Sequence, residues 1–197
     1  MFTISRADRA TRGGASCALE NGMICGHIGV ALGTRALSRD VPLGWLLAGA
    51  IAPDVLDVAE AALRMCNPNG LYSHSLPATA ALMLVLGIAA YAHVRTARAA
   101  VAVGLMVLLH LLLDFVTGEK VLWAGGPLLG FDLYRWPQLD FALELPVIVG
   151  GWWLLRRAAT DRRWITSWAM LAALLIVQAA INAMQLQSIS IAAIVRR

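Results

Sequence analysis

The sequence predicts an all-α protein, a polytopic membrane bundle of about five to six transmembrane helices. Of its 197 residues, 59% are hydrophobic and only 14% are charged, and the mean hydropathy is +0.70. An average soluble domain is about one quarter charged. Several apolar runs also approach the roughly 20 residues that a helix needs to cross the hydrocarbon core. The lipid bilayer is therefore the predicted surrounding of this chain.

The apolar runs predict six helices, with short segments between most of them. The ranges are 27–40, 43–63, 76–94, 99–117, 140–155 and 164–186. At about 1.5 Å per residue, the first barely crosses the core, so it could also be re-entrant or interfacial. The stretch 118–139 is rich in glycine, proline and aromatic residues, which is typical of a loop at the depth of the lipid headgroups.

The helices are expected to form one membrane-embedded domain over residues 23–197. Residues 1–22 are basic and have no apolar core, so they are not a secretory signal. We expect them to be a disordered extension or the product of a start codon chosen too far upstream. The three cysteines lack the spacing of a zinc knuckle. Cys25 and Cys66 could share a face and pair, or remain free thiols.

The isoelectric point of about 9.4 comes from arginines in the short loops between the apolar runs. This distribution is typical of topology signals and headgroup contacts, so we predict no nucleic-acid partner.

Polar groups interrupt the apolar helices at five places, and this is the main functional signal. They are Gly26-His27, Pro53-Asp54-Val55-Leu56-Asp57, Ser73-His74-Ser75, His110-Leu111-Leu112-Leu113-Asp114 and Asp140-Phe141-Ala142-Leu143-Glu144. If successive helices cross the membrane in opposite directions, all five groups fall on the same face, and His93 falls on the other. Carboxylates and imidazoles cost roughly 2.5–3.5 kcal/mol each in hydrocarbon, so they are rare there and usually functional.

The spacing within these groups brings side chains onto shared helix faces. It is i, i+3 in Asp54/Asp57 and i, i+4 in His110/Asp114 and Asp140/Glu144. Such pairs on facing helices build metal sites in bundle cores. Imidazole with carboxylate suits Zn²⁺, as one or two ions, with Mn²⁺ or Fe²⁺ as alternatives.

Each polar group also has an ordinary structural interpretation. A lone intramembrane histidine such as His110 is more often a hydrogen-bonded packing residue than a ligand. Ser73 and Ser75 could merely cap the helix that follows them. Asp140 could be a first-turn residue that the helix dipole favours. The convergence of all five groups on one face nevertheless favours a metal site.

In their order and spacing, four of these motifs resemble those of the predicted membrane-bound metal-dependent hydrolases. The motifs are Gly26-His27, the Pro53–Asp57 segment, Tyr72-Ser73-His74-Ser75-Leu76 and the His110–Asp114 segment. That family is thought to be distantly related to zinc-dependent phospholipase C and to single-strand-specific zinc nucleases. The resemblance covers roughly residues 23–155. It implies metal ligands at His27, Asp54, Asp57, His74, His110 and Asp114.

The sequence therefore predicts a membrane-embedded hydrolase that cleaves a phospholipid or lipid-linked phosphoester with a metal-activated water. Asp57 is expected to be a ligand or a carboxylate that orients an imidazole, and Glu144 a further ligand or general base. The candidate substrate-binding residues are Lys120, Arg135, Ser73 and Ser75.

Two other functions use the same residues. Intramembrane acids and histidines also build the pathways of ion- or proton-coupled transporters. A regulatory membrane subunit with a purely structural metal is the third possibility.

The positive-inside rule favours a bacterial-type inner-membrane protein whose polar cluster faces away from the cytoplasm. The loops opposite the cluster carry Arg35, Arg39, Arg95, Arg98, Arg156, Arg157, Arg162 and Arg163. The cluster face carries only Arg64, Lys120, Arg135, Arg196 and Arg197. Counting the three arginines before residue 22 would make the two faces equal.

Overall fold

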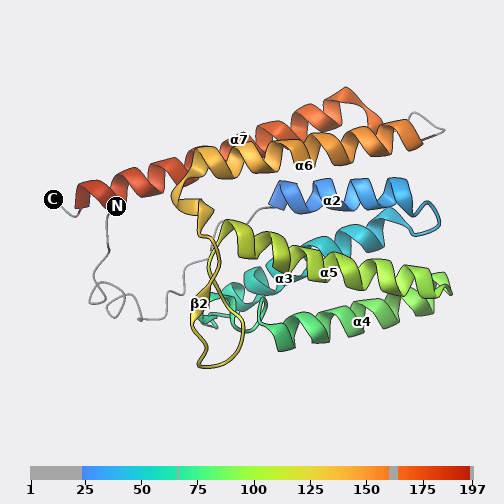
Figure 1. The fold of residues 1–197 in the computed structure, drawn as a ribbon, viewed down its shortest axis with the longest axis horizontal. Helices are drawn as coiled ribbons and strands as arrows, with labels where there is room; N and C mark the ends of the chain where they lie inside the picture. The colour runs from blue at the N-terminus through green and yellow to red at the C-terminus, as the bar shows by residue number, and fades with distance from the viewer. Residues whose placement is uncertain (1–23, 66, 160–163, 196–197) are drawn as a thin grey trace.

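A computed structural model describes residues 24–65, 67–159 and 164–195 (Figure 1). The predicted extension 1–22 lies outside this part of the chain, and so does Cys66. The helices are α2 (Ile24–Leu37), α3 (Leu43–Ala62), α4 (Leu76–Val94), α5 (Ala97–Thr117), α6 (Pro137–Ala158) and α7 (Trp168–Val195). The predicted all-α bundle is thus confirmed. The last helix begins four residues later than expected, because Trp164–Thr166 form a 3-10 turn before it.

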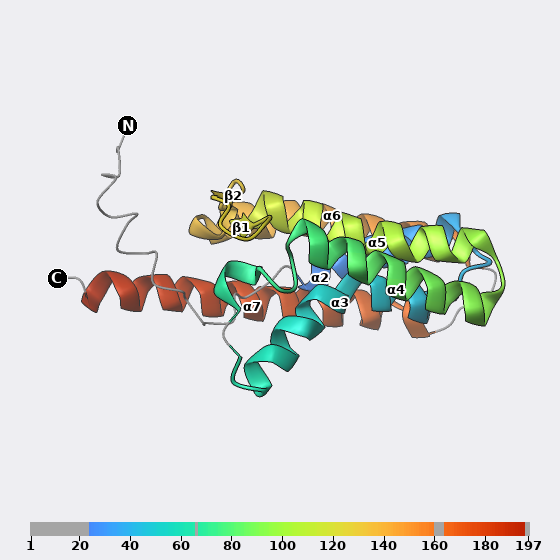
Figure 2. The ribbon, with the colours of Figure 1, turned by 90° about the horizontal axis from the view of Figure 1, so that it is seen from below.

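The helices lie along a common long axis and alternate in direction (Figure 1). α2 packs between α3 and α6, α5 packs against α3 and α4, and α7 covers α6. The C-terminal part of α3 leaves the bundle axis, as Figure 2 shows. The beginnings of α2, α4 and α6 and the ends of α3 and α5 consequently lie at the same end of the molecule.

Four helices in the described part of the chain are long and apolar enough to cross a membrane. They are α4, α5, α6 and residues Trp168–Gln187 of α7. The 14 residues of α2 would span only about 21 Å of a core about 30 Å thick. α3 has the length but carries Asp54, Asp57 and Glu60. The two helices that supply much of the polar cluster are therefore also the two least suited to lipid.

Glycines allow the backbones of neighbouring helices to approach closely. A Cβ atom on Gly151 of α6 would overlap the carbonyl oxygen of Gly29 on α2, and one on Gly29 would lie 2.7 Å from the Val147 carbonyl oxygen. Gly49 of α3 is equally close to α5, since its Cβ would lie 2.7 Å from the Val103 carbonyl oxygen. Small residues at such crossings are typical of membrane helices.

The segment between α5 and α6 is folded onto the bundle. It contains the short antiparallel strands β1 (Lys120–Val121) and β2 (Leu128–Leu129), followed by a 3-10 turn at Leu133–Arg135. The Leu76 amide donates to the Leu122 carbonyl (2.9 Å), and the Phe131 amide donates to the Phe115 carbonyl (3.0 Å). These bonds fix the hairpin against α4 and α5 and hold Lys120 at the end of the bundle.

Candidate metal centre

Four predicted ligands converge at one end of the bundle, which we call the His/Asp end. They are Asp54 on α3, His74 just before α4, and His110 and Asp114 on α5. One ligand atom from each lies within 4.8 Å of the other three. The last three residues are buried, and the Asp54 side chain is 20% exposed. Two nitrogen and two oxygen donors at this separation suit Zn²⁺ or a related divalent ion.

The protonation state of His110 follows from its hydrogen bond to α3. Its Nδ1 lies 2.7 Å from the Ala50 carbonyl oxygen, which can only accept, so Nδ1 carries the proton. The other ring nitrogen, Nε2, then presents a lone pair to the cluster. It lies 3.6 Å from Asp54 Oδ1 and 3.7 Å from Asp114 Oδ2. This is the arrangement in which proteins commonly hold a metal-ligating imidazole.

His74 is oriented by a chain of polar side chains. The Ser73 hydroxyl donates to Asp57, so its oxygen accepts from His74 Nδ1, which lies 2.7 Å away. Asn67 donates to both Asp57 Oδ1 (2.7 Å) and Ser73 Oγ (2.9 Å). His74 Nε2 is thereby left to face the cluster, 3.1 Å from Asp114 Oδ2.

The Nε2 atoms of His74 and His110 lie 3.0 Å apart. If each ring carries its only proton on Nδ1, two lone pairs point at each other with two carboxylates beside them. A shared cation or proton is needed to make this arrangement favourable.

The two other predicted ligands lie one layer further out. The His27 ring stacks on His110 with 3.9 Å between the ring centres, and its Nε2 lies 3.3 Å from the His110 carbonyl oxygen and 3.5 Å from Asp114 Oδ1. Asp57 contacts the cluster through His74, whose Nδ1 is 3.5 Å from Asp57 Oδ2. In this structure both border the four-residue set, and their direct ligation stays a prediction.

Residues 22–186 match the family described as YdjM inner membrane protein. The chain belongs to this family. Its description agrees with the four apolar helices and confirms the predicted inner-membrane location and the lipid surrounding. It states no reaction, so a hydrolase function of this YdjM family member stays a prediction. No curated protein and no solved structure matches the chain significantly.

The predicted substrate-binding residues lie in different settings in this YdjM family member. Lys120 is buried, and its Nζ lies 3.3 Å from Asp114 Oδ2. Arg135 is half exposed and pairs with Asp132. Ser73 belongs to the chain that orients His74, and Ser75 caps α4 by accepting from the Ala78 amide (3.3 Å). Lys120 is therefore the one of the four that brings a positive charge to the cluster.

Tyr134 closes the hairpin side of the His/Asp end. Its hydroxyl accepts a hydrogen bond from Thr117 Oγ1 at 3.1 Å. Burial, and next the negative charge of Asp114, raise the pKa of the Tyr134 phenol well above its ordinary value. The phenol therefore keeps its proton at neutral pH.

Sequence reasoning missed several residues that support the site. Asn67 lies in the turn Asn67-Pro68-Asn69-Gly70, whose composition signals only a turn. Gln178 is a lone polar residue in the apolar α7, and the rule that intramembrane polar groups are functional could have found it. Cys25, one of the two thiols that could have paired, is free and buried.

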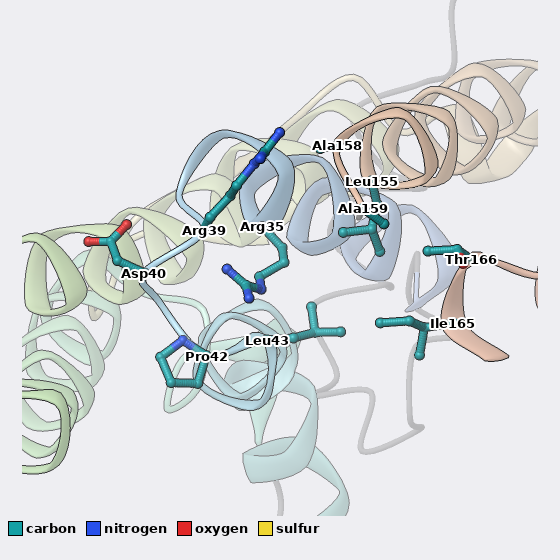
Figure 3. A pocket seen from close by; sticks show the side chains of 10 residues that line it. All are labelled: Arg35, Arg39, Asp40, Pro42, Leu43, Leu155, Ala158, Ala159, Ile165 and Thr166. Carbon is teal, nitrogen blue, oxygen red and sulfur yellow. The ribbon is translucent and has the colours of Figure 1, made fainter. Parts of the chain in front are cut away.

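The opposite end of the bundle, which we call the arginine end, has a different character. It carries Arg35, Arg39, Arg98, Arg156 and Arg157. A cavity of about 600 Å³ opens here between the end of α2, the start of α3 and the end of α6 (Figure 3). Arg35 lies on one side of it and donates to the Ser38 carbonyl at 3.3 Å, while Ile165 and Thr166 lie on the other.

Proposed function

We propose that the His/Asp end is the active site of a metal-dependent hydrolase that cleaves a phospholipid or a lipid-linked phosphoester. The observation that carries this proposal is the pair of imidazole Nε2 atoms 3.0 Å apart with two carboxylates beside them, while the Nδ1 atom of each ring is engaged by a hydrogen bond on its far side. The resemblance of the surrounding motifs to membrane-bound metal-dependent hydrolases supports the same conclusion.

The donor set fits a divalent ion by charge as well as by chemistry. Asp54 and Asp114 together would offset the two positive charges, and His74 and His110 would ligate as neutral imidazoles. A bound Zn²⁺ would lower the pKa of water from 15.7 to about 7 and polarise a phosphoryl oxygen. One ion satisfies these four ligands. A second ion, or Mn²⁺ or Fe²⁺ in place of zinc, is part of the same prediction.

The protein side chains around this centre would divide the remaining tasks. Asp57 acts through Ser73 and is therefore a positioning residue for His74. Lys120 would hold a phosphate oxygen next to the ligand Asp114. Asp54 is the only partly exposed member of the set, so we infer that the substrate enters beside α3.

A lipid substrate is supported by the apolar residues around that entrance. Six apolar side chains near Asp54 and His74 in the sequence are exposed. They are Val55 and Val58 on α3, Leu63 and Met65 just after α3, Tyr72 before α4, and Leu76 at the start of α4. Exposed apolar side chains gathered around a polar centre are typical of a surface that meets lipid or an apolar ligand. We infer that acyl chains lie along this surface while the phosphoester reaches Asp54.

The test compares two histidines at opposite ends of the molecule. His110→Ala should abolish both the bound metal and the hydrolysis of phospholipid vesicles, because it removes a ligand and the ring that packs against His27. His93→Ala is the matched control, since His93 lies exposed beside Trp45 and should leave both unchanged. Elemental analysis of the purified proteins and phosphate release measure the two effects, and circular dichroism reports the fold. Metal content and hydrolysis that both persist in His110→Ala would refute the proposal.

The transporter alternative has less support. A conduit needs polar groups through the depth of the bilayer. Among the described residues, α3 and α5 continue beyond Ala50 as an apolar core that includes Leu46, Val103 and Met106. Metal or proton flux in proteoliposomes without hydrolysis would reverse this ranking. A tightly bound metal without flux or hydrolysis would instead favour a regulatory subunit.

A further inference from the structure

We propose that the chain holds a second cation site beside the first, built from oxygen ligands of Asp140 and Glu144 on α6 and Gln178 on α7. The occupant that fits is a hard divalent cation such as Mg²⁺, Mn²⁺ or Ca²⁺. This site goes beyond the proposed hydrolase and does not depend on it, because cation binding to these residues can be measured whether or not the protein hydrolyses a substrate.

Within the described part of the chain, the two carboxylates are buried together without a positive partner. Asp140 is 0% exposed and Glu144 is 1% exposed, and their i, i+4 spacing brings them onto the same face of α6. Both oxygens of Asp140 and Oε2 of Glu144 find no hydrogen-bond partner among the residues that the structure describes. No lysine, arginine or histidine among the described residues lies within 4.0 Å of either group. Uncompensated buried carboxylates are strongly unfavourable, so they require a counter-charge or a proton.

Gln178 is an independent sign of a ligand. It lies in the apolar α7, is 1% exposed, and has an amide oxygen and nitrogen that both lack a hydrogen bond of normal geometry. Its side chain faces the Glu144 carboxyl, and the backbone of Gly26 engages the same carboxyl from α2. The Glu144 carboxyl is thus held from two sides, by the Gly26 backbone and by the Gln178 side chain, while its Oε2 finds no hydrogen-bond partner among the described residues. An amide oxygen is a good ligand for a hard cation.

The chemistry of the donors decides between classes of cation. This set offers only oxygen, which suits Mg²⁺, Mn²⁺ and Ca²⁺, whereas the neighbouring set with two imidazoles suits Zn²⁺. Two carboxylates match the charge of a divalent ion in a medium of low dielectric. The negative charge of Asp114 also acts on both Asp140 and Glu144, which increases the need for a positive charge here.

The experiment measures Mn²⁺ binding to the whole protein in detergent by electron paramagnetic resonance. The protein is first loaded with Zn²⁺, which gives no signal, and excess zinc is removed. Wild type should then bind one Mn²⁺ per chain, and Mg²⁺ or Ca²⁺ should displace it. Asp140→Asn and Glu144→Gln should each weaken Mn²⁺ binding at least tenfold while the zinc content stays the same. Asp40→Asn, the same substitution at the arginine end, should behave like wild type.

Three outcomes would overturn the proposal. They are no zinc-resistant Mn²⁺ binding by wild type at millimolar Mn²⁺, unchanged binding by Asp140→Asn and Glu144→Gln, and a loss of zinc that parallels Mn²⁺ uptake. The first would mean that protons neutralise the pair, and the last that Mn²⁺ enters the His/Asp centre. Mn²⁺ binding that persists in His110→Ala supports the second site even if the first holds no metal. A rise in the thermal midpoint of wild type on adding Mg²⁺ tests the site without any variant.

Discussion

The His/Asp end and the arginine end both carry many ionisable groups, but the two ends differ in how exposed these groups are and in what stabilises their charges. At the arginine end, Arg98 pairs with Asp40 at the surface, where the two side chains are 59% and 43% exposed. Arg156 and Arg157 lie over tryptophan rings, with the guanidinium of Arg156 5.2 Å from the Trp152 ring centre. At the His/Asp end, Lys120 and Asp114 are both buried. Exposed charges at the arginine end can be solvated by water or lipid headgroups. The buried charges at the His/Asp end depend on one another.

The largest difference between the ends should appear when one cation of each pair is replaced by methionine. Lys120→Met leaves Asp114 buried beside Asp54 without its ammonium partner. In protein treated with a chelator, we expect a loss of about 3–5 kcal/mol in the free energy of unfolding. Arg98→Met should cost less than about 1 kcal/mol, because the exposed pair is screened by solvent. Titration with sodium dodecyl sulfate in mixed micelles, followed by tryptophan fluorescence, measures both.

Added Zn²⁺ provides the control for this comparison. If the metal lies beside Asp114, it should reduce the penalty of Lys120→Met and leave that of Arg98→Met unchanged. Equal penalties for the two variants in chelated protein would mean that the Lys120–Asp114 pair is not the buried ion pair described above.

The second prediction concerns the close contact between α2, which reaches both ends of the bundle, and α6. α2 carries His27 at one end and Arg35 at the other, and its middle is pressed against α6 at Gly29 and Gly151. Gly151→Ala would force a methyl group into the Gly29 carbonyl, so we expect a loss of roughly 1–3 kcal/mol in unfolding free energy and a lower metal content. Gly150→Ala is the matched control, since nothing lies within 4 Å of its Cβ position. Identical stability of the two variants, measured by the same titration, would contradict this account of the crossing.

The parts of this molecule that could be predicted from sequence are those marked by a pattern that extends over many residues. Runs of apolar residues predicted every helix, and alternation across the bilayer predicted that His74, His110, Asp54 and Asp114 would meet. The hairpin at Lys120 was missed, because strands of two residues show no periodicity. An imidazole-orienting role was among those predicted for Asp57, but the parts of Asn67 and Ser73 in the same chain were missed because they depend on a turn in which Asn69 adopts a left-handed conformation with φ of 52°. Such geometry brings together side chains whose spacing carries no signal.

The smallest effect should separate two neighbouring serines of this turn. Ser73 joins Asp57 to His74, so Ser73→Ala should leave the imidazole less firmly oriented and weaken Zn²⁺ binding about tenfold, as outer-layer changes commonly do. Among the described residues, the Ser75 hydroxyl bonds only to the Ala78 amide and so caps α4. Ser75→Ala should therefore lower stability by about 0.5–2 kcal/mol and leave metal affinity unchanged. Competition with a zinc indicator measures the affinities. If Ser75→Ala lowered the affinity for zinc as much as Ser73→Ala, the His/Asp end would be responding to a general loosening of α4. The Asp57–Ser73–His74 chain would then have no special role in holding the metal.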